Sequence, residues 1–213
     1  MILYYCLILF ILLLIINYNS SESYIILNCN SKNIPKDMIK YQKKCKTNNY
    51  GFIPRSLYPD IVELVNNHSN ELRDEFITNN GLEIFKHIQL NGGCRYFNLI
   101  KNGQKLNHSN KFPNIMKLIE NIPNLKDASL SCLDPNTKTK IHNNFNYKYY
   151  RAHIPLYIPK GKTGICVEKE CRTWKYNEFL LVDENFMHQV WNFTNKPRVL
   201  LLLDIDKVKF NKN

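Results

Sequence analysis

The sequence predicts a mainly β fold with flanking helices, of the sandwich, jelly-roll or barrel kind. Apolar residues make up 44% of the 213 residues, which is enough for a buried core. In residues 59–79 and 113–120 they recur at helical spacing. After residue 126, short β-rich runs alternate with Pro, Gly and Asn, in residues 128–133, 147–158, 164–167, 178–182, 187–192 and 199–205. We therefore expect helices packed on a sheet of short strands.

The chain divides into three parts. Residues 2–16 are apolar and carry no charge. At ~1.5 Å per residue this run is short for a bilayer core of ~30 Å, so residues 1–17 are predicted to be a signal peptide or a signal-anchor helix, with cleavage left open. Residues 18–55 are polar and read as a linker or stem. Residues 56–208 form the main domain, with its β-rich core at about 126–206, and we expect that domain in the secretory pathway.

The charge of the chain is strongly positive, with a formal net charge of +11 and a pI near 9.3. The basic residues are scattered, and no finger, basic-zipper or Lys/Arg-Gly-aromatic motif is present, so no nucleic-acid partner is expected. The sequence also lacks a P-loop, a Gly-x-Ser-x-Gly elbow, a Gly-x-Gly-x-x-Gly turn and a Cys-x-x-Cys pair. Their absence removes the commonest nucleotide, serine-hydrolase and zinc sites.

Cysteines and glycosylation sequons fit a secreted or lumenal domain. Six cysteines follow Cys6, an even number that allows up to three disulfides in an oxidising compartment: Cys29, Cys45, Cys94, Cys132, Cys166 and Cys171. Cys166 and Cys171 flank a predicted hairpin tip and are the first candidate pair. Asn-x-Ser/Thr sequons permit a glycoprotein and stand at Asn19, Asn67, Asn107 and Asn192.

Two predicted strands carry polar residues on one face. In the run 147–158, the strand period of two puts Tyr149, Arg151 and His153 together and leaves an apolar opposite face. In the last strand, Arg198 begins a face that also holds Leu200, Leu202 and Asp204, and the other face is wholly apolar. Two histidines enter from separate places: His142 precedes the first of these strands, and His188 lies in another β-rich run.

The spacing of these residues, taken together, resembles the aspartyl/asparaginyl β-hydroxylase family of Fe(II)- and 2-oxoglutarate-dependent dioxygenases. Ser131 stands eleven residues before His142, with Arg151 nine and His153 eleven after it. An Arg-Thr-Trp follows at 172–174, then Asp-x-x-Phe-x-His-x-Val-Trp at 183–191, and Arg198 stands ten residues after His188. The likeness covers about residues 91–206.

The resemblance implies a double-stranded β-helix, or jelly-roll, core and assigns roles. His142 and His188 would bind Fe(II), and Ser131 and Arg198 would hold the distal carboxylate of 2-oxoglutarate, a task suited to a guanidinium fork. Arg151 and His153 would contact the C1 carboxylate of the cofactor or an acidic substrate, so the catalytic set is His142, His188 and Arg151. Asn144 stands where most such oxygenases place a carboxylate ligand, and Tyr149 where family members often carry a basic residue.

The implied activity is hydroxylation of the β-carbon of an Asp or Asn side chain in a protein substrate, with consumption of O2 and release of succinate and CO2. A disulfide-rich domain is one candidate partner. The apolar N-terminal segment matches the type II, single-pass membrane topology of the animal members, with a lumenal catalytic domain; cleavage would make the protein secreted. Two alternatives stay open: a lipid acyl-chain hydroxylase of the same fold, which apolar residues beside the pocket would favour, and a non-catalytic jelly-roll binding module.

Overall fold

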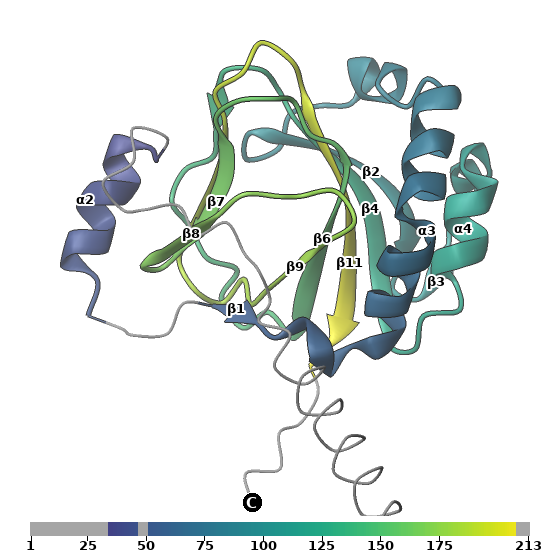
Figure 1. The fold of residues 1–213 in the computed structure, drawn as a ribbon, viewed down its shortest axis with the longest axis horizontal. Helices are drawn as coiled ribbons and strands as arrows, with labels where there is room; N and C mark the ends of the chain where they lie inside the picture. Colours follow the sequence, from purple (N-terminus) through teal and green to yellow (C-terminus); the bar gives the residue numbers. More distant parts are fainter. Residues whose placement is uncertain (1–33, 47–50, 208–213) are drawn as a thin grey trace, which may run out of the picture.

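The computed structural model describes residues 34–46 and 51–207 (Figure 1). In these residues the large sheet has seven strands, in the order β1 (Phe52–Ile53), β9 (Leu180–Val182), β6 (Tyr149–Tyr157), β11 (Arg198–Asp206), β4 (Leu125–Leu133), β2 (Cys94–Lys101) and β3 (Gln104–Lys105). The small sheet has four, in the order β5 (Thr137–Lys138), β10 (His188–Asn192), β7 (Thr163–Val167) and β8 (Glu170–Arg172). The helices are α2 (Lys36–Lys44), α3 (Pro59–Thr78) and α4 (Pro113–Ile119), with short 3-10 turns at Arg55–Leu57, Glu83–His87 and Asn107–Lys111.

The eight strands from β4 to β11 wind as a jelly roll. Within that set, the large sheet runs in the order β9-β6-β11-β4 and the small sheet in the order β5-β10-β7-β8, all antiparallel. The chain therefore crosses between the two sheets as it advances, which is the pattern of a double-sheet jelly roll. The predicted mainly β fold with a jelly-roll core is confirmed, and β1, β2 and β3 extend the large sheet at its two edges.

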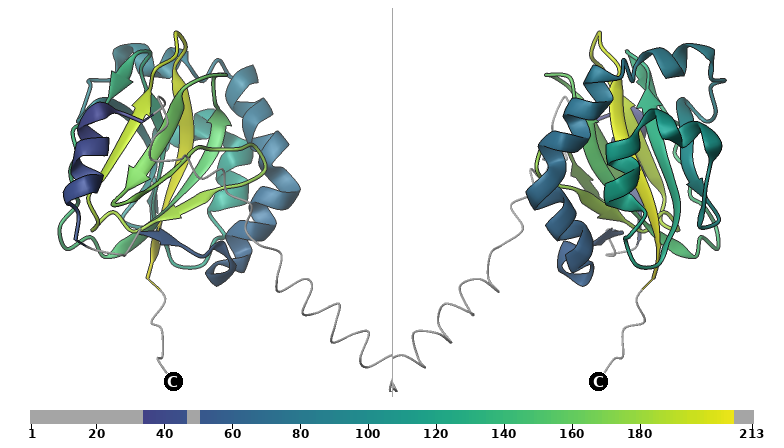
Figure 2. Two further views of the ribbon diagram at one scale, coloured as in Figure 1. Left: turned by 60° about the vertical axis from the view of Figure 1, so that its left-hand side comes forward. Right: turned by 90° about the vertical axis from the view of Figure 1, so that its right-hand side faces the viewer.

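Helices α3 and α4 cover the outer face of the large sheet (Figure 1; Figure 2, right). Both begin with Pro at the first helical position, where the missing N–H is not needed. The apolar stripe of α3 is buried at Ile61, Leu64, Val65, Leu72 and Phe76. It packs against the outward residues of β6 and β11, such as Ile154 and Leu201. These contacts form the main core and leave the inner face of the same strands to a second, smaller core between the two sheets.

The strand alternation read from the sequence is observed in β11. Val199, Leu201, Leu203 and Ile205 lie in the main core under the helices. Arg198, Leu200 and Leu202 face the space between the sheets. Period-two patterning therefore assigns the faces of this strand correctly.

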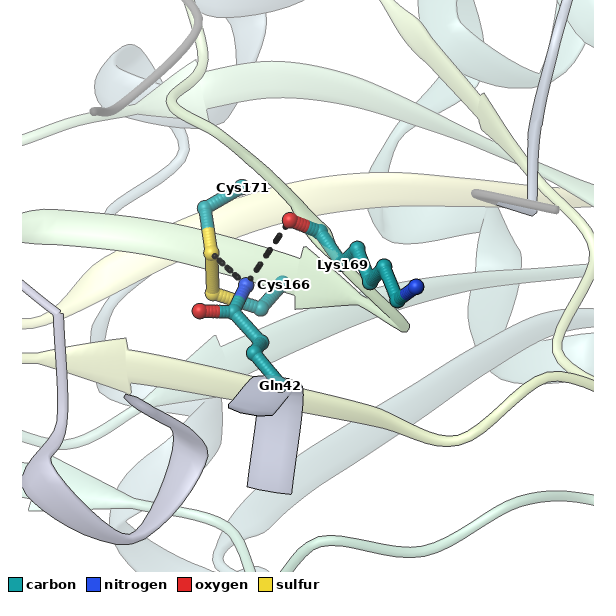
Figure 3. Close-up of a disulfide and its surroundings, with 4 residues drawn as sticks. All are labelled: Gln42, Cys166, Lys169 and Cys171. Carbon is teal, nitrogen blue, oxygen red and sulfur yellow. Dashed lines mark hydrogen bonds between the residues drawn. A yellow bond between two sulfur atoms is a disulfide. The ribbon is translucent and has the colours of Figure 1, made fainter. Parts of the chain in front are cut away.

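The outer face of the small sheet is covered by α2 (Figure 2, left). Met38 on α2 is buried with Trp191 and the disulfide between Cys166 and Cys171. In Figure 3, the amide nitrogen Nε2 of Gln42 donates to the Lys169 carbonyl oxygen and to Cys171 Sγ, each at 3.0 Å. The disulfide predicted at the hairpin tip is confirmed, and it supports the docking of α2.

One buried asparagine connects the two sheets of the jelly roll through hydrogen bonds. Asn192, at the end of β10, has no exposed surface, and its Nδ2 donates to the carbonyl oxygens of Leu133, Asp134 and Lys196 at 2.8–3.1 Å. Its Oδ1 accepts from the hydroxyl of Thr194 at 2.7 Å. These bonds hold the small sheet against the end of β4, beside the start of β11.

Two segments differ from the sequence prediction. The region 18–55, expected as a polar stem, contains α2, because Met38 and Tyr41 lie on one helical face and pack on the small sheet together with Ile34, which precedes the helix. The stretch between the predicted helices 59–79 and 113–120, where no strand was predicted, contains β2 paired with β4. The apolar run 2–16 lies outside the described residues. Among the residues that are described, no helix has the length and apolar character needed to cross a membrane.

Candidate active site

A cavity of about 360 Å³ lies between the two sheets and is lined by all six residues singled out in the sequence. The large sheet supplies Ser131 from β4, Arg151 and His153 from β6, and Arg198 from β11. His188 from β10 and His142 from the loop between β5 and β6 enter from the small-sheet side. The remaining lining residues are Asn91, Gly92, Cys94, Tyr96, Thr139, Asn144, Glu184, Val190, Leu200 and Leu202.

His142 and His188 face each other although 46 positions separate them. Their backbones form an isolated antiparallel bridge, in which the N–H of each donates to the carbonyl oxygen of the other, at 3.1 and 2.8 Å. Directly opposed residues in such a pair project their side chains to the same side. The ring centroids accordingly lie 4.4 Å apart.

Both imidazoles are held in one tautomer. Nδ1 of His142 is 2.8 Å from the carbonyl oxygen of Lys140, and Nδ1 of His188 is 2.9 Å from that of Phe186. A carbonyl oxygen only accepts, so Nδ1 carries the proton and Nε2 keeps a lone pair. Burial lowers the pKa of His188, although the carboxylate of Glu184 opposes the shift, so this ring is neutral at physiological pH. A neutral imidazole with its second nitrogen hydrogen-bonded is the form that ligates metals.

Asn144 and Glu184 lie beside the histidine pair. Among the described residues, no set of three or more His, Cys, Asp or Glu side chains is spaced to hold a metal ion. Asn144 Nδ2 donates to Oε2 of Glu184 at 2.6 Å, and its backbone N–H donates to the Glu184 carbonyl oxygen at 2.8 Å. The asparagine is therefore fixed, with its amide nitrogen engaged by the glutamate.

Arg198 is a buried cation without a counter-ion. Its guanidinium lies over the Trp174 ring at 4.9 Å, and Nε has no hydrogen-bond partner. Within the described part of the chain no Asp or Glu pairs with it, and burial lowers its pKa. An arginine stays protonated even so. Because a buried unpaired charge is costly, this arrangement calls for an anionic ligand in the cavity.

His153 is a second buried polar group that lacks partners. Both ring nitrogens are unsatisfied, and the ring stacks on Trp174 with centroids 6.3 Å apart. Burial lowers its pKa well below the usual value, and the charges of Arg151 and Arg198 add to the shift. The side chain is thus a neutral imidazole that can donate one hydrogen bond to a ligand. Ser131, opposite Leu200 on the neighbouring strand, adds a hydroxyl on the same floor of the cavity.

Arg151 differs from Arg198 because its charge is already balanced. Nε and Nη2 donate to the two oxygens of Asp204 at 2.6 and 2.7 Å, and Nη1 donates to Oε2 of Glu184 at 2.8 Å. Nη2 also donates to the hydroxyl of Tyr147 at 2.5 Å. The carboxylates of Glu184 and Asp204 raise the pKa of Arg151 against the effect of burial.

Sequence reasoning did not assign a role to three further residues at or beside the cavity. Asp204 stands on the same strand face as Arg198, but its role as partner of Arg151 depends on the pairing of β6 with β11. Glu184 lies inside the block around His188, and that position alone gave no sign of the ion pair. Tyr96 lines the cavity from β2, a strand that the sequence reading missed. Burial raises the pKa of Tyr96, which therefore remains a neutral hydroxyl.

The fold and the cavity together define a jelly-roll protein whose cavity holds two histidines with free Nε2 lone pairs and a buried arginine without a counter-ion. The sequence model of the family described as Aspartyl/Asparaginyl beta-hydroxylase matches residues 63–207. The chain belongs to this family, as its motif spacings predicted.

Curated relatives include an ornithine lipid ester-linked acyl 2-hydroxylase from Rhizobium tropici, which is 30% identical over 97 residues. That match covers 45% of this chain and 34% of the relative. The aspartyl/asparaginyl beta-hydroxylase of Mus musculus is 24% identical over 160 residues, which is 70% of this chain and 22% of the relative. The chain thus spans about a third or less of the length of these relatives.

Among solved structures, a Pseudomonas putida prolyl-4-hydroxylase matches with a TM-score of 0.45 and 12% identity, over 73% of this chain and 100% of the other. An oxidoreductase of the 2OG-Fe(II) oxygenase family from Burkholderia pseudomallei gives a TM-score of 0.42 and 11% identity, over 60% and 77%.

Proposed function

We propose that this protein is an Fe(II)- and 2-oxoglutarate-dependent hydroxylase. The observation that carries the proposal is the presence, in one cavity, of two histidines with free Nε2 lone pairs and a buried arginine with no counter-ion. The two histidines fit a divalent iron, and the buried arginine fits the carboxylate of an organic acid. When bound, iron and 2-oxoglutarate supply the chemistry that inserts one oxygen atom of O2 into a substrate C–H bond, while the other oxygen ends in succinate as CO2 leaves.

The chain's own residues divide the remaining work. His142 and His188 hold the metal through Nε2, and their Nδ1 bonds to backbone carbonyls fix the ring orientation. Arg198 and Ser131 hold the distal carboxylate of 2-oxoglutarate. His153, neutral in its buried place, donates a hydrogen bond toward the C1 carboxylate, beside Arg151. Leu200, Leu202 and Val190 form the apolar part of the lining and limit the entry of water.

For the substrate, the family supports an Asp or Asn side chain of a protein, hydroxylated at the β-carbon. The N-terminal apolar segment of the sequence and the disulfide between Cys166 and Cys171 are consistent with a protein substrate in the secretory pathway. A lipid acyl chain is the second candidate, because the relative from Rhizobium tropici is a lipid acyl hydroxylase. Two large apolar residues that follow or precede cavity residues in the chain, Phe145 and Leu90, are 82% and 54% exposed and suit a lipid surface.

The test is anaerobic binding of 2-oxoglutarate to the full-length chain with and without Fe(II), followed by succinate release in air. We expect saturable, iron-dependent binding in the unmodified protein. His188→Ala should lose the iron dependence, and Arg198→Ala should lose 2-oxoglutarate affinity by at least tenfold. His87→Ala, at an exposed position, is the matched control and should bind normally. A folded protein that binds neither iron nor 2-oxoglutarate would leave only the jelly-roll binding module.

A further inference from the structure

The end of the cavity formed by Arg151 offers a single unused donor. An arginine has five N–H groups. Four of those of Arg151 are engaged by Asp204, Glu184 and Tyr147, which leaves one N–H on Nη1. A substrate carboxylate, which arginine usually binds through two parallel hydrogen bonds, cannot be held in that way here.

The acceptor beside that donor is Glu184. Its side chain is 6% exposed and contributes to the cavity lining. Oε2 accepts hydrogen bonds from Arg151 and Asn144, whereas Oε1 accepts none from the described residues. The glutamate therefore presents one free lone-pair oxygen to a ligand, next to the one free N–H of Arg151.

The local charge is negative rather than positive. Two carboxylates, Glu184 and Asp204, surround one guanidinium, and the Tyr147 hydroxyl that bonds Asp204 adds no charge. Arg198, the other cationic residue in the cavity lining, stands six residues before Asp204 on β11, which separates the backbones of these two residues by roughly 20 Å at the rise of a strand. Tyr149, two residues before Arg151 on its strand, supplies no further cation. A ligand carboxylate at this end would meet like charge.

We propose, on the basis of the hydroxylase function above, that this end of the cavity selects a carboxamide over a carboxylate. The amide oxygen of an Asn side chain accepts from Nη1 of Arg151, and its NH2 group donates to Oε1 of Glu184. The free N–H of Arg151 and the free oxygen of Glu184 are then both paired, and no charge is added to the anionic cluster. Glu184 is thus the specificity-determining residue, and the acceptor in the substrate is Asn in preference to Asp.

The experiment uses two random nonapeptide pools that differ only in a central Asn or Asp. The full-length chain is incubated with Fe(II), 2-oxoglutarate and O2, and the added oxygen on the central residue is read by mass spectrometry. We expect the Asn pool to react at least tenfold faster. Glu184→Gln should reduce that ratio at least tenfold, because it removes the charge that repels Asp, while Glu63→Gln, at an exposed position on α3, leaves the ratio unchanged.

A second measurement needs no variant. N-acetylasparagine methylamide should inhibit peptide hydroxylation by the unmodified chain more strongly than N-acetylaspartate methylamide. Loss of iron-dependent 2-oxoglutarate binding defeats the hydroxylase function itself. With that binding intact, preference for the Asp pool, equal rates, stronger inhibition by the aspartate compound, or reaction of neither pool overturns the carboxamide proposal.

Discussion

Replacing Arg198 by Met tests whether the buried cation exists for a ligand rather than for the fold. Methionine has a similar length and no charge, and its sulfur packs well against an aromatic ring. The substitution removes a guanidinium that is 2% exposed and whose Nε lacks an acceptor. It therefore removes a group that stabilises the bound state and destabilises the empty one.

The magnitude follows from two opposing contributions. An unsatisfied buried donor costs ~1–3 kcal/mol, and the variant recovers this amount. The lost cation–π contact with Trp174 is worth ~0.5–2 kcal/mol, and a sulfur–aromatic contact returns part of it. Without ligand, the free energy of unfolding should be between unchanged and ~2 kcal/mol higher in Arg198→Met. With Fe(II) present in both samples, 2-oxoglutarate at ~100 times the Kd of the unmodified protein adds ~2.7 kcal/mol to that protein. It adds at most ~1.4 kcal/mol to the variant, whose affinity is at least tenfold lower.

Urea unfolding under anaerobic conditions measures the free energy of unfolding with and without ligand. The midpoint reports the change in stability as long as the dependence of the free energy on urea concentration stays the same. When 2-oxoglutarate is added, the difference in unfolding free energy should therefore shift by at least ~1.3 kcal/mol in favour of the unmodified protein. Lys117→Met, which removes an exposed positive charge, controls for net charge and should show no such shift relative to the unmodified protein. If Arg198→Met without ligand is destabilised by more than ~1 kcal/mol, Arg198 serves the fold and the reasoning fails.

Two further predictions concern buried ionisable groups. Burial and the neighbouring charges of Arg151, Arg198 and His188 lower the pKa of His153, so below pH ~6.5 the unfolded chain takes up a proton that the folded chain does not. The unmodified protein should therefore lose unfolding free energy as the pH falls from 7 to 5, and His153→Phe should lose up to ~1.4 kcal/mol less per pH unit. Urea titration at each pH measures this, and equal pH slopes for the two proteins would contradict the prediction. Glu75 accepts two backbone N–H groups at the start of α4, at 2.7 and 2.6 Å, so Glu75→Gln should lower the free energy of unfolding by ~1–2 kcal/mol, and an unchanged urea midpoint would refute that role.

The parts of the fold that the sequence predicts are those in which a single strand or helix carries a complete pattern. The strands that contain Arg151 and Arg198 have one apolar face each, so their orientation follows from period two alone. In β2 the residues from Arg95 to Phe97 are all half-buried. Polar and apolar residues therefore do not alternate there, and the pattern does not predict a strand. The short helix α2 has few buried positions and is surrounded by Lys and Asn, so composition suggested a stem.

The candidate site divides in the same way. The identity of its six residues follows from their spacing and the family resemblance, and the structure brings all six to one cavity. The charge state of that cavity does not follow, because Glu184 and Asp204 reach Arg151 from positions 33 and 53 residues away. Strand register and loop path decide which carboxylates neutralise a given arginine. Neither can be predicted from the residues around that arginine in the sequence. The difference between the balanced Arg151 and the unbalanced Arg198 thus became visible only in three dimensions.

Asn192 makes glycosylation and folding mutually exclusive at one sequon. Its amide nitrogen, the atom to which a sugar would be attached, donates to three carbonyl oxygens inside the protein. A chain that enters a lumenal compartment meets the glycosylation machinery while still unfolded, so a glycan at Asn192 would block closure of the two sheets beside Arg198. Rapid formation of the strand pair β7–β10 would shield this asparagine from modification. The yield of correctly folded protein in a secretory host would then depend on the rate of strand pairing relative to the rate of sugar transfer.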